Sequence, residues 1–87
     1  MLPEQATIAR LAVYPNPTEG QVSIQPPSPS SGRVEVRDIT GRLVKSGSVR
    51  AQQPMLQLDI TEYRPGVYFF SWAGEDGTAA TVRVVLQ

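Results

Sequence analysis

The 87-residue sequence predicts one all-β domain, a thin sandwich of two sheets, and three observations support this. Eight Pro and seven Gly divide the chain into short stretches, a spacing of roughly ten residues that is typical of sandwiches and barrels. Most of these stretches alternate apolar and polar residues, as half-buried strands do. No stretch keeps the apolar spacing of an amphipathic helix over three turns.

Seven strands are expected, each bounded by a turn signal, at residues 8–14, 21–25, 33–38, 42–50, 55–60, 67–73 and 79–86. The first strand must stop at 15–17, Pro-Asn-Pro, because proline cannot donate a hydrogen bond to a strand ladder. The second alternates cleanly, which places Val22 and Ile24 on the inner face.

The Pro/Ser-rich segment 26–32 reads as a surface loop of the sandwich, and a proline-rich ligand motif is the alternative. Residues 33–38 alternate again, with charged side chains of alternating sign outward. A tight turn follows at 38–41, since Asp suits its first position and Gly its last. Gly47 lies within the strand at 42–50 and predicts a β-bulge there.

Residues 55–60 place alternate apolar side chains on one face. The stretch 67–73 is apolar on both faces, which indicates a central strand covered on both sides or one whose outer face meets a partner. Asp76-Gly77 predicts the hairpin turn before the last strand at 79–86.

Tyr68, Phe70 and Trp72 share one face of the stretch 67–73. Three interpretations of this face are open. It packs the core, it stacks sugars, or it binds a protein partner as an exposed apolar patch.

Composition excludes several function classes. The chain has no Cys and no His, which removes disulfides, thiol and imidazole catalysis, and thiolate or imidazole metal sites. A formal net charge of zero argues against nucleic-acid binding. No apolar run reaches the roughly 20 residues that span a bilayer. We expect no enzyme activity, no cofactor and no metal site.

Two weak chemical candidates remain. Lys45 is the only lysine, and a Ser–Lys dyad with Ser46 or Ser48 is conceivable, although the alternation of the strand directs Lys45 to solvent. Glu75 and Asp76 are neighbouring carboxylates that would make at most a poor calcium site, because no Asp-rich loop surrounds them.

Three ordered stretches resemble a known family. Residues 11–20, Leu-Ala-Val-Tyr-Pro-Asn-Pro-Thr-Glu-Gly, look like the opening motif of the type A C-terminal sorting domain of the type IX secretion system of Bacteroidetes. Residues 34–44 resemble its central Asp-x-x-Gly-Arg hairpin. Leu58-Asp59-Ile60 with Gly66-Val67-Tyr68-Phe69 is similar to its late Gly-x-Tyr strand, and the ending at 82–87 also fits.

The resemblance implies an immunoglobulin-like β-sandwich of about seven antiparallel strands that is an address rather than an enzyme. It would direct a cargo, placed N-terminal to it, from the periplasm through the outer-membrane translocon to the exterior or the cell surface. Shuttle and sortase components would often follow, with cleavage of the domain. We expect residues 1–7 to be the remnant of a linker to a missing cargo domain and 8–87 to be the sorting domain.

The resemblance also selects candidate recognition residues from the motifs and the late strands: Tyr14, Pro15, Asn16, Pro17, Gly20, Asp38, Gly41, Arg42, Gly66, Tyr68, Phe70, Trp72 and Arg83. Each has a structural explanation as well, as a strand end, a turn or a core residue. We expect fold maintenance to account for most of them. We place recognition in residues 66–87, through an open edge of the last strand or through the apolar face of residues 68, 70 and 72. An open edge would also allow a weak homodimer.

A binding module of a secreted enzyme, adhering to carbohydrate or protein, is the alternative function. It predicts that sugars quench the fluorescence of Trp72.

Overall fold

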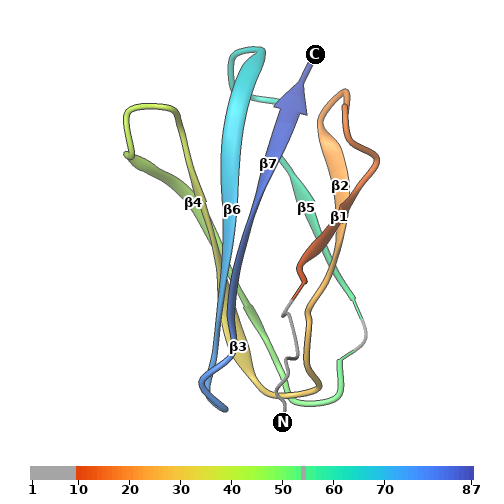
Figure 1. The fold of residues 1–87 in the computed structure, drawn as a ribbon. Helices are drawn as coiled ribbons and strands as arrows, with labels where there is room; N and C mark the ends of the chain where they lie inside the picture. The colour runs from red at the N-terminus through yellow and green to blue at the C-terminus, as the bar shows by residue number, and fades with distance from the viewer. Residues whose placement is uncertain (1–9, 54) are drawn as a thin grey trace, which may run out of the picture.

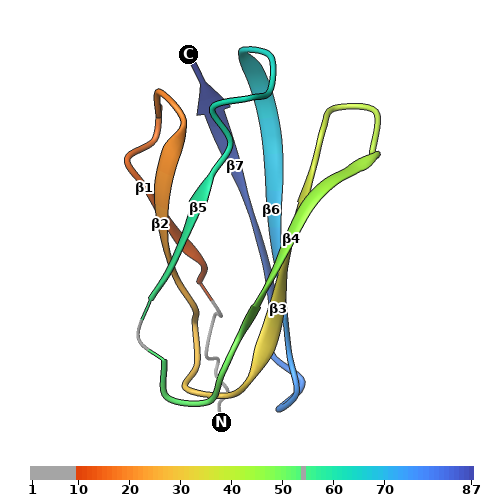
Figure 2. The same cartoon turned by 180° about the vertical axis from the view of Figure 1, so that it is seen from behind.

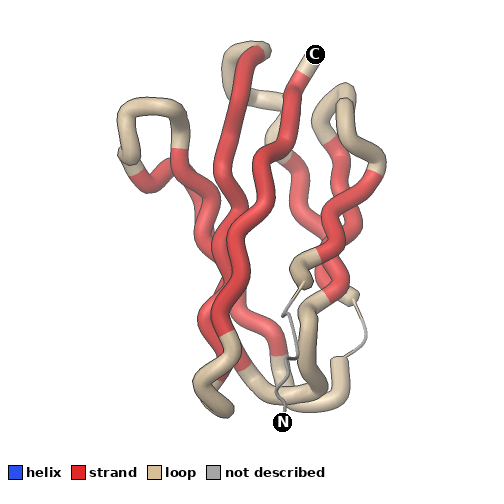
Figure 3. The backbone as a smooth tube through the Cα atoms, viewed as in Figure 1, coloured by secondary structure: helices blue, strands red, loops and turns tan. Residues whose placement is uncertain are grey.

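The computed structural model describes residues 10–53 and 55–87, which form seven strands in two sheets (Figure 1). The strands, coloured red in Figure 3, are β1 (Ala12–Tyr14), β2 (Gln21–Gln25), β3 (Gly32–Arg37), β4 (Leu43–Val49), β5 (Leu56–Asp59), β6 (Gly66–Gly74) and β7 (Ala79–Leu86). The described residues form no helix, and so none that could cross a membrane.

The strands pair antiparallel in a three-stranded sheet of order β1-β2-β5 and a four-stranded sheet of order β4-β3-β6-β7. The two sheets face each other as the layers of a sandwich (Figures 1 and 2). The all-β, immunoglobulin-like prediction with seven antiparallel strands is thus confirmed.

The core lies between the sheets and follows the alternation of each strand. Val34 pairs with Trp72 and Val36 with Phe70, so the buried side chains of β3 and β6 lie on the same face of the four-stranded sheet. The buried apolar side chains are Leu11, Val13, Val22, Ile24, Val34, Val36, Val49, Ile60, Tyr68, Phe70, Trp72, Val84 and Leu86. Removing this apolar surface from water is the main stabilising contribution in a domain of this size.

The loops gather at two poles. The loops 15–20, 38–42 and 60–65 lie with the C-terminus at one end, which we call the upper pole because it is at the top of Figure 1. The loops after β2, β4 and β6 lie at the opposite end, the lower pole (Figures 1 and 2).

Two predictions differ from the structure, one for the first strand and one for Gly47. Within the described residues the first strand begins only at Ala12, while residues 8 and 9 of its predicted range lie outside them, as does the predicted linker 1–7. Gly47 makes no bulge, and the register shifts instead at Val36/Arg37. A side chain at Gly47 would press on Leu56 of the facing sheet, so this glycine permits a close approach of the sheets rather than a kink.

Candidate functional site

The first motif connects β1 to β2 within the three-stranded sheet and on the way contacts β7 of the other sheet. β1 ends at Tyr14, because Pro15 and Pro17 cannot continue its ladder with β2. Between them, the Asn16 side chain reaches the last strand. Its Nδ2 donates to the carbonyl of Arg83 at 2.9 Å, and its Oδ1 accepts from the amide of Val85 at 3.0 Å. We call this pair of bonds the Asn16 clasp. Both X-Pro bonds of the motif are cis.

Thr18 extends the contact along β7. Its amide donates to the Val85 carbonyl at 2.9 Å, and its carbonyl accepts from the Gln87 amide at 2.8 Å. Its hydroxyl, almost fully buried, accepts from the Gly20 amide and donates to the Gln21 carbonyl. Sequence reasoning did not select Thr18, although a threonine two residues before a turn glycine is a recognisable turn signal.

These contacts correct the prediction of an open final edge. β7 is the edge strand of its sheet. However, its outward backbone groups between Arg83 and Gln87 are already bonded, by the clasp at Arg83 and Val85 and by Thr18 at Val85 and Gln87. A partner strand cannot add to this half of β7 unless the segment 15–18 leaves.

Gly20 closes the first motif against the loop after β5. Its φ of 143° lies in a region that favours glycine, and an added Cβ would collide with the side chain and backbone of Thr61. The Gly20 carbonyl accepts from the Ile60 amide at 2.7 Å. Glycine is therefore required here for both conformation and space.

The second motif is a turn held by one carboxylate. Asp38 Oδ1 accepts from the Thr40 amide at 2.9 Å, the Thr40 hydroxyl at 2.6 Å and the Arg42 amide at 3.1 Å. Its other oxygen lies 3.3 Å from Arg42 Nε. Gly41, with φ 88°, completes the turn by donating to the Asp38 carbonyl. The Thr40 hydroxyl is the main cause of a pKa lower than usual at Asp38, since hydrogen bonds to the ionised form favour it.

The same Asp-x-Thr arrangement occurs twice more. Asp59 accepts from the amide and hydroxyl of Thr61, and Asp76 does so from Thr78. In both, the threonine hydroxyl is again the main cause of a lowered carboxyl pKa. The sequence itself carries this repeated Asp-x-Thr spacing.

The third motif fixes the start of β6. The buried Tyr68 donates its hydroxyl to the Arg64 carbonyl at 2.7 Å, four residues upstream. This resembles the tyrosine corner of immunoglobulin-like sandwiches. Tyr63 donates to the Val44 carbonyl at 2.8 Å, and its ring lies 6.2 Å from that of Tyr68. Burial raises the pKa of Tyr63. Gly66, with φ 152°, makes the turn into the strand.

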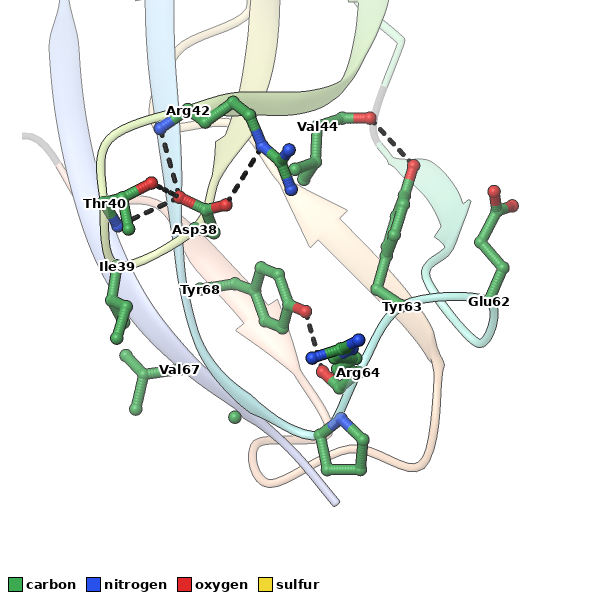
Figure 4. Close-up of a pocket in the computed structure, with 12 residues that line it drawn as sticks. Asp38, Ile39, Thr40, Arg42, Val44, Glu62, Tyr63, Arg64, Val67 and Tyr68 are labelled. Carbon is green, nitrogen blue, oxygen red and sulfur yellow. Dashed lines mark hydrogen bonds and ion pairs between the residues drawn. The ribbon is translucent and has the colours of Figure 1, made fainter.

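The second and third motifs face each other across one groove at the upper pole (Figure 4). The groove has a volume of about 680 Å³. Asp38 and Arg42 line it from one loop. Tyr63 and Arg64 line it from the other loop, and Tyr68 from the start of β6.

Phe70 and Trp72 do not reach the surface. Both are almost fully buried, and Trp72 donates its indole N–H to the Thr78 hydroxyl at 2.9 Å. The core interpretation of the face formed by Tyr68, Phe70 and Trp72 is confirmed. The sugar-platform and exposed-patch interpretations are wrong, because the alternation of β6 turns these rings toward the opposite sheet.

The structure therefore brings most candidate residues to one pole in two groups. Asn16 joins Arg83, while Tyr14, Pro15, Pro17 and Gly20 shape the segment around it. The second group lines or borders the groove and consists of Asp38, Gly41, Arg42, Gly66 and Tyr68. Only Phe70 and Trp72 stand apart, in the core below.

The weak chemical candidates gain no support. Lys45 does not point to solvent: it is half-buried, and its Nζ donates to the Asp59 carbonyl at 2.7 Å, bridging the open sides of the two sheets. Ser46 and Ser48 pair with the outward residues Glu35 and Arg33, on the other face from Lys45. Asp76 already accepts hydrogen bonds from the amide and hydroxyl of Thr78. The described residues contain no group of three potential metal ligands.

Comparisons with known proteins add two findings. The profile of the family described as "Secretion system C-terminal sorting domain" matches residues 12–87. A solved structure of a DUF3244 family protein from Bacteroides vulgatus, described as an immunoglobulin-like β-sandwich, superposes with a TM-score of 0.71, at 13% identity, over 91% of this chain and 96% of that one. At this identity it shows the fold alone. No curated protein matches the chain.

Proposed function

The chain belongs to the family of secretion system C-terminal sorting domains, and from this premise we propose that the secretion machinery reads it as a folded unit at its upper pole. The domain is a C-terminal sorting signal for type IX secretion, so it interacts with that machinery and directs its cargo across the outer membrane to the surface or the exterior. The family is not an enzyme family.

One observation carries the choice of the upper pole. All three sequence motifs act there, and each holds backbone rather than presenting a reactive group: the clasp holds β7, Asp38 holds the turn after β3, and Tyr68 holds the entry into β6. We infer that most motif residues maintain the shape of this pole, and that the machinery reads the surface they maintain.

The finer steps belong to the same proposal. The domain, residues 8–87, crosses the periplasm attached through the linker 1–7 to its cargo. The outer-membrane translocon then receives it, and shuttle and sortase components process it. Weak self-association would use one of the other edge strands, β1, β4 or β5, because the clasp occupies the upper half of β7.

An export assay tests this function. Residues 1–87 are fused behind a fluorescent reporter with a periplasmic signal peptide and expressed in a Bacteroidetes host and in a mutant lacking the translocon. We expect reporter outside the first host and trapped in the periplasm of the mutant. The mass of the exported reporter reports on cleavage.

Retention in both hosts, with the domain shown to be folded, would contradict the sorting function. A carbohydrate- or protein-binding module would then be the better hypothesis. Because Trp72 is buried, that alternative requires direct glycan-binding measurements rather than fluorescence quenching.

A further inference from the structure

The outer face of the four-stranded sheet carries a strip of apolar and arginine side chains at its upper end. The register places Leu43, Arg37, Phe69 and Arg83 side by side across β4, β3, β6 and β7. The next pair toward the pole is Val67 and Val85. We call these six residues the Phe69 strip.

Half of the strip is exposed, namely Leu43, Phe69 and Arg83, whereas Arg37, Val67 and Val85 are half-buried. Phe69 is 37% exposed and Leu43 is 45% exposed. Ile39, 73% exposed in the neighbouring loop, lies beside Val67 at the edge of the groove in Figure 4. Three of the five large exposed hydrophobic side chains among the described residues therefore gather at one end of one face. Clustered exposed apolar residues mark interaction sites.

The lower half of the same face differs. There the outward positions of β6 and β7 are Ser71 with Thr81, and Ala73 with Ala79. These small side chains offer little apolar area to a partner, so the strip has a clear lower boundary.

The charge of this face indicates the partner. Arg33, Arg37 and Arg83 point outward from it against the single acid Glu35, in a chain whose formal net charge is zero. Glu35 is paired with both Arg33 and Arg37. No ion pair occupies Arg83 within residues 10–53 and 55–87. An aromatic ring between two arginines is the composition of interface hot spots.

We propose that the Phe69 strip is the docking surface for an acidic, apolar protein segment of the secretion machinery. This proposal rests on the proposed sorting function and deepens it. Each motif holds the backbone within one residue of the strip. The clasp binds Arg83 and Val85, Asp38 directly follows Arg37, and Tyr68 lies between Val67 and Phe69. An anionic lipid surface fits less well, because only three arginines point out of this face and Glu35 pairs with two of them. Attraction to anionic lipid usually takes a cluster of about four to eight basic residues.

The test compares matched variants in the export assay. Phe69→Thr removes the ring and Arg83→Glu reverses the charge. Met55→Thr also replaces an exposed apolar side chain by threonine, and Arg50→Glu also reverses a charge, but both lie at the lower pole, where Met55 is 38% exposed. We expect the strip variants to lower the exported reporter about tenfold and the controls to match wild type. Equal urea midpoints for all purified variants exclude misfolding as the cause.

Photo-crosslinking identifies the occupant. A crosslinker at position 69 should capture a protein in the intact host, and Arg83→Glu should weaken that capture; the same crosslinker at position 55 should not capture that protein. Capture of no protein, with Arg83-dependent binding to phosphatidylglycerol vesicles, would overturn the proposal in favour of a membrane surface. Wild-type export with undiminished export of the strip variants would overturn the strip alone. Failure of wild-type export would remove the sorting function and the strip with it.

Discussion

At the scale of single residues, the motifs act by satisfying backbone groups. Asn16 is the clearest case, because one amide side chain supplies both the donor and the acceptor that a neighbouring strand would otherwise offer to β7. Asn16 lies between two prolines, which have no backbone N–H to donate. The hydrogen bonds from this part of the chain to β7 are therefore made by the Asn16 side chain.

We expect Asn16→Ala to lower the free energy of unfolding by roughly 1–2 kcal/mol, because two largely solvent-exposed hydrogen bonds are lost. Glu19→Ala, an exposed change in the same loop, should alter it by less than about 0.5 kcal/mol. Urea denaturation of the purified domain measures both. Equal effects of the two changes would show that the clasp contributes nothing to stability.

The three Asp-x-Thr turns predict a dependence of stability on acid pH. Asp38, Asp59 and Asp76 have lowered pKa values in the folded state. Their stabilisation is therefore present above the unfolded-state pKa of about 3.9 and is lost as the pH falls through the lower folded-state values.

Urea midpoints measured between about pH 6 and pH 2 should fall most steeply below about pH 4. A variant with all three changed to Asn should be less stable at neutral pH and should show a flatter decline. An equally steep decline in this variant would assign the acid sensitivity to other carboxylates.

At the scale of elements, clean alternation of apolar and polar residues predicted the strands well. The position of the β-bulge was predicted poorly. β2 and β7 have the predicted bounds, since their inward residues alternate without interruption. Gly47 predicts a bulge in β4, but the register between β3 and β4 shifts at Val36/Arg37 instead. A glycine marks a place where backbone can bend or approach, and only the facing sheet decides between the two.

Gly20 and Gly41 separate conformational cost from steric cost. Both have positive φ, which costs a residue with a Cβ about 1–2 kcal/mol. A Cβ at Gly41 meets nothing within 4 Å, whereas one at Gly20 collides with Thr61. We expect Gly20→Ala to be the more destabilising by a further 1–3 kcal/mol or so. Thermal or urea unfolding measures both, and a smaller effect at Gly20 would contradict the contact with Thr61.

At the scale of the whole molecule, a single core joins both sheets. Trp72, the only tryptophan, lies in this core and therefore reports on the packing of the two sheets together. A small domain with one core is expected to unfold in one cooperative step.

We expect the urea transition followed by Trp72 fluorescence to coincide with that followed by far-ultraviolet circular dichroism. Glycans should leave the fluorescence unchanged, because the indole is inaccessible and bonded to Thr78. Separate midpoints for the two probes would indicate that the sheets come apart independently.

The sequence by itself determined the fold class, the number of strands and the family. Alternation and turn residues are local signals, and the motifs Pro-Asn-Pro, Asp-x-x-Gly-Arg and Gly-x-Tyr keep their order and spacing. The sequence could not decide which face of β6 is buried, because that stretch is apolar on both sides.

Only the tertiary structure decided that Asn16 meets Arg83, 67 residues away, that the edge of β7 is closed there, and that Phe69 rather than Phe70 faces solvent. These outcomes depend on which segments meet across the two sheets. Such long-range pairings are set by the packing of the whole core and leave no local pattern in the sequence.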